Sequence, residues 1–151
     1  MSCLADIFDV AKYILANRGR ISTWKLQKLC YYAQSWSLAW HDNQPLFNED
    51  FEAWTNGPVC RDLYNLHRGK YMIEASDLIV GNSANLRQDQ IDDINAVLDY
   101  YGDKEPFWLR EQTHSEDPWI FARKRGGCAT DEDSCSEPIL KEDMGYYYGS
   151  L

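Results

Sequence analysis

The sequence has 151 residues, of which 24 are Asp or Glu and 15 are Lys or Arg, so the net charge is −9. This length suits one domain over residues 1–151, and a surface of this charge repels phosphates, which argues against a general nucleic-acid-binding function. The charge either attracts a basic partner or simply keeps a cytosolic protein soluble. No stretch approaches the roughly 20 apolar residues of a membrane span, and no secretory leader is visible, so we expect no membrane association and a cytoplasmic location.

Two helices are expected at the start of the chain. Apolar residues at helical spacing predict the first over residues 5–17, closed by Gly19. Ser22 or Thr23 can cap the second, which runs to about Trp40. Apolar side chains cover most of the circumference of this second helix, which is typical of a buried helix. We therefore expect it at the centre of the fold, with its aromatic side chains packed in the core.

A small β-hairpin is expected next, because two short apolar pieces, residues 46–47 and 51–54, flank a polar turn. Alternate side chains of a strand point to opposite faces. If the first residue of the second piece faces the core, Glu52 and Trp54 point outward.

The residues after this piece predict a change from strand to helix. Gly57 can adopt a positive φ angle, and Pro58 fits the first turn of a helix because its missing N–H would have no partner there. We expect this helix to run from Pro58 to about His67.

The remaining chain is expected to alternate helices with irregular connections. Residues 70–86 are predicted to be irregular with one short strand. Further helices are expected at residues 88–101, 106–112, 117–124 and 139–148, with Pro118 and Pro138 in the first turns of the last two. Residues 125–137 are acidic and rich in Gly and Ser, which predicts a mobile loop. The expected fold is mainly α (α+β): a compact helical domain around a long central helix, with a small β-hairpin.

The five cysteines are scattered: Cys3, Cys30, Cys60, Cys128 and Cys135. Cys30 and Cys60 lie in apolar surroundings, so we expect buried, reduced thiols. Cys128 and Cys135 could form a disulfide or half of a metal site, although their separation does not fit the usual ligand spacing of about two to four residues. We therefore expect no metal and no cofactor.

Three groups of residues, in this order, resemble one known family. They are Leu26-Gln27-Lys28-Leu29 with Tyr31-Tyr32-Ala33-Gln34, then Asp50-Phe51-Glu52-Ala53-Trp54 with Gly57-Pro58-Val59, and finally Thr113-His114 with Glu116-Asp117-Pro118-Trp119 and Ala122. From Asp6 to Tyr148 the chain is similar to the Panacea domain, the SocA-like antitoxin family, which includes phage-associated proteins. It departs from the family at Arg87, where Ser or Thr usually opens a helix, and in its acidic insert with two cysteines. The resemblance implies structural motif roles for Gly57, Pro58, Thr113, His114, Pro118 and Trp119.

The resemblance implies an antitoxin, which neutralises a co-encoded toxin by binding it or delivers it as an adaptor to a cytosolic protease. The alternatives are a phage or mobile-element protein that binds a host factor, and an uncharacterised hydrolase that uses His114. No placed nucleophile and base, P-loop or nucleophile elbow is found, which favours a binding protein over an enzyme. We expect His114 to be structural, with its imidazole hydrogen-bonded to the backbone of the turn between two helices. The oligomeric state stays open.

The hairpin and its exit form the predicted contact area for the partner. An outward Trp54 among acidic residues suits a basic or apolar partner, because aromatic anchors inside a charged rim are common in interfaces. The alternative is that Trp54 covers the core against the long helix. The residues expected to contact the partner are Glu49, Asp50, Glu52, Trp54, Asn56 and His67.

Overall fold

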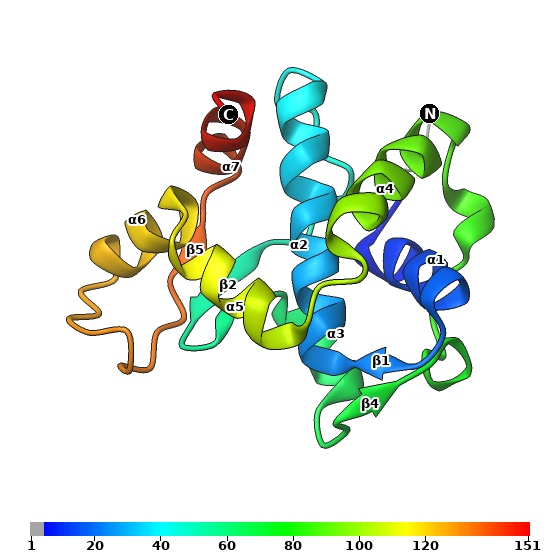
Figure 1. Cartoon of the computed structure of the whole chain (residues 1–151), viewed down its shortest axis with the longest axis horizontal. Helices are drawn as coiled ribbons and strands as arrows, with labels where there is room; N and C mark the ends of the chain where they lie inside the picture. The colour runs from blue at the N-terminus through cyan, green and yellow to red at the C-terminus, as the bar shows by residue number, and fades with distance from the viewer. Residues whose placement is uncertain (1–4) are drawn as a thin grey trace.

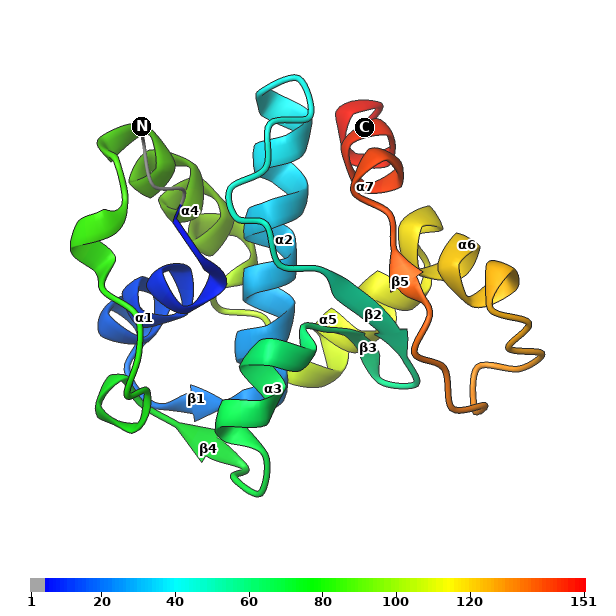
Figure 2. The ribbon, with the colours of Figure 1, turned by 180° about the vertical axis from the view of Figure 1, so that it is seen from behind.

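The computed structural model describes residues 5–151, so Cys3 lies outside the described part, and the central element is helix α2 (Thr23–Trp40). α2 passes through the middle of the molecule (Figure 1). Helices α1 and α4 lie on one side of α2 and helices α5, α6 and α7 on the other, as Figure 2 shows from behind. Most side chains of α2 are buried. The predicted mainly α fold around a long central helix is confirmed.

The elements follow one another with short connections, apart from the longer segments 41–50 and 126–137. The helices are α1 (Ile7–Arg18), α2, α3 (Arg61–His67), α4 (Gln88–Tyr101), α5 (Pro106–His114), α6 (Asp117–Arg125) and α7 (Lys141–Gly149). The strands are β1 (Ile21–Ser22), β2 (Phe51–Trp54), β3 (Gly57–Val59), β4 (Met72–Ile73) and β5 (Pro138–Ile139), and two 3₁₀ turns, η1 (Ala75–Asp77) and η2 (Ser83–Asn85), precede α4. β1 pairs with β4, and a second antiparallel sheet has the order β3-β2-β5. In the described part of the chain, no helix is both long and apolar enough to cross a membrane.

Helix ends form where side chains satisfy free backbone groups. The Asp6 carboxylate accepts a hydrogen bond from the Asp9 N–H, and the Asp9 carboxylate accepts one from the Asp6 N–H, so α1 opens with a capping box. Ser22 caps α2 by accepting from the Lys25 N–H. Gly19 closes α1 with φ of 72°. The predicted bounds of α1, α2 and α4 agree with the structure to within two residues.

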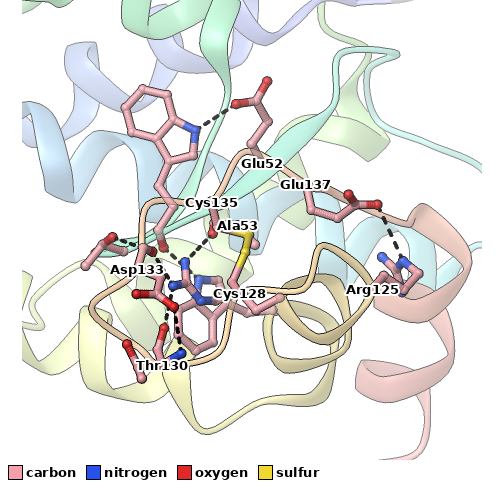
Figure 3. Close-up of a disulfide and its surroundings, with 12 residues drawn as sticks. Glu52, Ala53, Arg125, Cys128, Thr130, Asp133, Cys135 and Glu137 are labelled. Carbon is pink, nitrogen blue, oxygen red and sulfur yellow. Dashed lines mark hydrogen bonds and ion pairs between the residues drawn. A yellow bond between two sulfur atoms is a disulfide. The ribbon is translucent and has the colours of Figure 1, made fainter.

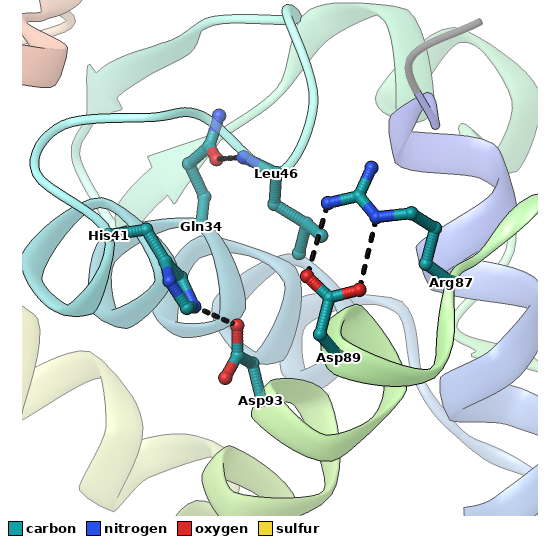
Figure 4. A network of polar contacts seen from close by, with 6 residues as sticks. All are labelled: Gln34, His41, Leu46, Arg87, Asp89 and Asp93. Carbon is teal, nitrogen blue, oxygen red and sulfur yellow. Dashed lines mark hydrogen bonds and ion pairs between the residues drawn. The ribbon is translucent and has the colours of Figure 1, made fainter. Parts of the chain in front are cut away.

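Polar side chains fasten the C-terminal half of α2 to its neighbours (Figure 4). Gln34 accepts a hydrogen bond of 2.7 Å from the Leu46 N–H and donates one of 2.6 Å to the Phe47 carbonyl. Just beyond the helix, His41 Nε2 lies 2.6 Å from a carboxylate oxygen of Asp93 in α4. These contacts fix both α4 and the chain that leads to the hairpin.

Arg87 does not open α4 in the way that a Ser or Thr would. The Gln90 side chain accepts the Arg87 N–H at 2.8 Å, while the Arg87 guanidinium binds both carboxylate oxygens of Asp89. The departure from the family pattern at Arg87 therefore leaves the start of this helix capped.

The hairpin does not lie where the sequence pattern placed it. The predicted pairing of residues 46–47 with residues 51–54 is wrong. β2 pairs instead with β3, and Thr55 and Asn56 form the turn between them. The amide of Gln34 binds the Leu46 N–H and the Phe47 carbonyl, and it takes the place of a partner strand for these two groups.

The predicted helix start at Pro58 is also wrong. Pro58 lies in β3 opposite Ala53, on an edge strand, where a residue without N–H removes no necessary ladder bond. Gly57 has φ of 118°, as predicted. The helix begins later, at Arg61, and ends at His67 as expected.

Pro138 likewise begins a strand and not the last helix. In β5 it pairs with Glu52 of β2, and α7 starts only at Lys141. α7 then packs along α2 (Figure 1). The sheet therefore ties the C-terminal segment to the hairpin.

The chain between α6 and β5 has no helix or strand, and several contacts fasten it (Figure 3). Cys128 and Cys135 form a disulfide, which is one of the two alternatives open from the sequence. The carbonyls of Thr130 and Asp133 accept hydrogen bonds from the Arg123 guanidinium of α6. Cys30 and Cys60 are buried and free, as predicted. The mobility expected for residues 125–137 stays a prediction.

Candidate partner-binding site

The tip of the hairpin lies between two hollows in the surface, which share Trp24 and Asn56. One hollow of about 340 Å³ extends to Trp54, Arg61 and residues 134–136 of the disulfide loop. The other, of about 170 Å³, is lined also by Lys28, Pro106, Phe107 and Arg110. We call this area the hairpin-tip surface, and it comprises Trp24, Lys28, Trp54, Asn56, Arg61, Phe107 and Arg110.

The outer face of β2 carries a small cluster of aromatic and charged side chains. Phe51 and Ala53 are buried, and Glu52 and Trp54 lie half-buried on the other face, so the predicted alternation is observed. The Trp54 indole N–H donates to Glu52 at 2.7 Å. Arg61 binds the same carboxylate at 3.0 Å and lies over the indole ring, 5.1 Å from its centre. These contacts hold the Trp54 ring in one orientation.

Trp54 also packs against α3. Its ring meets Tyr64 edge-on, with the ring centres 4.9 Å apart. Trp54 is thus half-buried against α3, and its ring lines the larger hollow.

The acidic residues of the predicted contact area already have partners within the chain. The Glu49 carboxylate accepts from the Ile7 N–H at 3.1 Å, which adds an acceptor at the start of α1. Asp50 forms an ion pair with Lys141 of α7. Glu52 pairs with Arg61 as described. These three acidic side chains therefore stabilise contacts within the fold. The groups that the hairpin tip presents to a partner are cations and aromatic rings.

The prediction of a surface contact at His67 is wrong. This side chain is only 3% exposed, and its Nε2 lies 3.0 Å from the side-chain nitrogen of Gln27 in α2. Gln27 also donates to the Cys60 carbonyl and accepts from the Cys60 N–H, so it clamps the start of α3. His67 faces inward because α3 has one side against α2, and burial lowers its pKa.

The Thr-His and Pro-Trp motif residues lie in α5 and α6, which pack against the hairpin. Trp119 is buried, and its indole N–H donates to the Trp54 carbonyl at 2.9 Å. Pro118 lies in the first turn of α6, as predicted. Thr113 is buried and donates to the Arg110 carbonyl.

His114 packs as an aromatic ring. It stacks on Trp119 with ring centres 3.9 Å apart and planes 11° from parallel. Its Nε2 is buried and has no hydrogen-bond partner in the described part of the chain, so the expected bond from this atom to the turn backbone is not formed. Burial, and then the charge of Arg110, lower the pKa of His114 to about 4.

This lowered pKa predicts a pH dependence of stability. In the unfolded chain the imidazole takes up its proton near pH 6.5. His114 therefore contributes stability that is present above pH 6.5 and is lost as the pH falls toward 4. His114→Phe keeps the stacked ring and removes the titration. In urea denaturation we expect it to match the wild type within about 1 kcal/mol at pH 7 and to gain about 1–3 kcal/mol relative to it at pH 4.5. Parallel stability profiles of the two proteins across this range would contradict the assignment.

Three buried polar residues that shape the site were not predicted as site residues, although two of them, Gln27 and Lys28, belong to the first motif of the family resemblance. Arg123, 4% exposed, donates to the Ala53 carbonyl at 2.7 Å and stacks over the Trp119 ring. Gln27 and Lys28 lie in the buried part of α2. A signal was present for the last two, because polar side chains inside an otherwise apolar helix require partners.

The comparison with known families agrees with this geometry. The sequence model of the family described as "Antitoxin SocA-like, Panacea domain" matches residues 26–120, which is more than half of the chain. The chain belongs to the SocA-like antitoxin family. The matched part of this Panacea domain runs from the first turn of α2 through the hairpin to α6, and so includes most of the hairpin-tip surface. No curated protein and no solved structure matches the chain.

Proposed function

We propose that this Panacea-domain protein is an antitoxin that neutralises a co-encoded protein toxin in the cytoplasm by binding it directly through the hairpin-tip surface. Membership of the SocA-like antitoxin family is the observation that carries this proposal.

The chemistry of the surface supports binding to a protein. Phe107 is 69% exposed, and Trp24 and Trp54 present half-buried rings beside Arg61 and Arg110. Trp, Tyr and Arg carry much of the energy in protein interfaces. The ring of Trp54 is already fixed by Glu52, Arg61 and Tyr64, so little side-chain freedom would be lost when it is covered.

Two other functions compete with this one. As an adaptor, the same surface would hold the toxin while a cytosolic protease degrades it. As a phage or mobile-element protein, it would bind a host factor without a cognate toxin. The geometry gives no support to a hydrolase that uses His114, because that ring is stacked on Trp119 and its Nε2 is buried.

The deciding experiment is co-expression with the product of the neighbouring gene. Expression of that product alone should stop growth, and co-expression of the wild-type chain should restore growth and yield a complex that co-purifies. Restored growth without a stable complex, only in cells that contain the protease, would assign the adaptor mechanism. A neighbouring product that is harmless, or whose toxicity the chain does not relieve, would contradict the antitoxin proposal.

A further inference from the structure

Lys28 is a buried cation without an anionic partner. It lies in the middle of α2 and is 2% exposed. No hydrogen bond or ion pair within residues 5–151 engages its Nζ, and the ammonium lies 5.1 Å from the centre of the Trp24 ring. A buried charge without a counter-charge costs folding free energy, and an ordinary core helix would carry an apolar residue at this position.

The Lys28 side chain lines the smaller hollow of the hairpin-tip surface, together with Trp24, Asn56, Pro106, Phe107 and Arg110. Gly57 of the hairpin lies close to the Lys28 side chain: a Cβ atom added at Gly57 would come within 2.7 Å of Lys28 Cε. The glycine thus leaves room for the lysine, and Lys28 is held against the hollow of about 170 Å³.

A second cation lies at the same hollow. The Arg110 Nε donates to the Asn56 side chain at 3.1 Å, and its NH1 binds Glu111 at 2.6 Å. Its NH2 forms no hydrogen bond with any described residue. Burial, and then the repulsion from Arg110, lower the pKa of Lys28 to about 7. Two cations therefore converge on one hollow in a chain of net charge −9.

We propose that this hollow is a binding site for a carboxylate carried on an apolar group. The Lys28 ammonium and the free NH2 of Arg110 bind the carboxylate oxygens, and the rings of Trp24 and Phe107 cover the apolar group. The apolar walls favour an organic carboxylate over inorganic phosphate. The carboxylate comes either from a free small molecule or from an acidic side chain or chain end of a partner protein.

Phenylacetate is a suitable probe, with phenylacetamide as its uncharged match and inorganic phosphate as the test of plain anion binding. Titrations followed by NMR of the Trp24 indole should show saturable binding of phenylacetate to the wild type. Binding of phenylacetamide, of phosphate, or of phenylacetate to Lys28→Met should be at least tenfold weaker. Lys25→Met, one turn away on α2, is the matched control and should bind as the wild type does. Equal binding of phenylacetate and phenylacetamide, or unchanged binding by folded Lys28→Met, would overturn the proposal.

The pH dependence of binding tests the site without any substitution. Arg110 on α5, itself paired with Glu111, is the charged group that lowers the pKa of Lys28; Lys28 acts in turn on His114, and Lys25 lies three residues earlier on α2. His114 is neutral above pH 6. Phenylacetate affinity should therefore fall at least fivefold between pH 6 and pH 9 as Lys28 loses its proton, in the wild type and in Lys25→Met alike. Constant affinity over this range would overturn the proposal even if Lys28→Met did not fold.

In the absence of ligand, the Lys28→Met variant should be more stable than the wild type. The Lys28 pKa is lowered on folding, so the burial cost is complete below pH 7 and shrinks as the pH rises toward 10.5. Lys28→Met should raise the melting temperature by several degrees at pH 6, with a smaller gain at pH 9. A lower melting temperature of Lys28→Met at pH 6 would show that the lysine stabilises the fold, and would contradict the proposal that its role is to bind a ligand.

A competition experiment separates the two sources of the carboxylate, and this arm alone rests on the antitoxin proposal. If saturating phenylacetate, but not phenylacetamide, weakens the complex with the toxin, a partner carboxylate occupies the hollow. If phenylacetate binds and the complex is unaffected, the natural ligand is a free carboxylate. The titrations of the protein alone stand whether or not a toxin is found, so failure of one proposal is distinguishable from failure of the other.

Discussion

Replacing Glu116 with alanine should lower the free energy of unfolding by about 3–5 kcal/mol. This residue is 2% exposed and joins three helices: Tyr32 of α2 donates to Oε1 at 2.9 Å, Tyr148 of α7 donates to Oε1 at 2.6 Å, and Gln112 of α5 donates to Oε2 at 2.9 Å. Both tyrosines are buried, so alanine would leave two buried hydroxyl groups without their acceptor and a cavity beside them. Urea denaturation at pH 7 measures the loss.

Glu116→Gln is the matched control for this substitution. Both tyrosine hydroxyls bind the same oxygen, and a glutamine can present one such oxygen to them while its NH2 group donates to Gln112, whose amide turns over to present its oxygen. Burial raises the pKa of Glu116, so removal of the charge also removes a desolvation cost. We expect Glu116→Gln to change stability by less than about 1 kcal/mol. Equal losses for the two variants, or a loss below about 1 kcal/mol for Glu116→Ala, would contradict this description of the core.

Arg123→Met should be the second most damaging change, at about 2–4 kcal/mol. Its guanidinium donates to the carbonyls of Ala53, Thr130 and Asp133, and so joins β2 to the disulfide loop. Methionine fills much of the volume but donates no hydrogen bond, so three carbonyls lose their donor. Urea denaturation should show the loss, and limited proteolysis should show faster cleavage within residues 126–137.

The exposed neighbour Lys124 supplies the control for Arg123. Lys124→Met removes a charge from the same turn of α6 and should leave both stability and proteolysis unchanged, because its side chain is exposed. Similar proteolysis of the two variants would mean that Arg123 does not order the loop.

Most of the helical framework could be predicted because it depends on local signals. Ser22 as a cap, Gly19 as a stop and the repeat of apolar residues placed α1 and α2 correctly. The hairpin was predicted at the wrong place because Gln34, a side chain of α2, binds the Leu46 N–H and the Phe47 carbonyl in place of a strand. Local sequence cannot show that a side chain will replace a strand.

Two of the prolines also show that local sequence signals do not decide the structure when strands pair. Pro58 and Pro138 carry a signal for the first turn of a helix, yet both lie in strands. Pairing with β2 decides their conformation: Pro58 pairs with Ala53 across the hairpin turn, and Pro138 pairs with Glu52, which is far away in the chain. Pro118, which takes part in no strand ladder, opens α6 as its local signal predicts.

The candidate site could be predicted only in part for a related reason. The period of two correctly placed Glu52 and Trp54 on the outer face. It could not show that Glu52 pairs with Arg61, or that His67 turns inward to Gln27, because both depend on how α3 packs. Lys28 was visible as a charge in an apolar helix and as part of a family motif, and only the hollow beside it marks it as a candidate binding residue.

The central claim is that the hairpin-tip surface binds the toxin, and the affinity of the purified complex tests it most directly. Calorimetry would compare the wild type with Trp54→Ala and with Trp40→Ala, a matched loss of a partly exposed indole at the far end of α2. Trp40 lies far from the hairpin-tip surface: along α2 it is about 24 Å from Trp24, the tryptophan of this helix that belongs to that surface. We predict that Trp54→Ala raises the dissociation constant by about 10-fold or more while Trp40→Ala leaves it within about 2-fold. Unchanged affinity in folded Trp54→Ala, or an equal loss in both variants, would contradict the assignment of this surface.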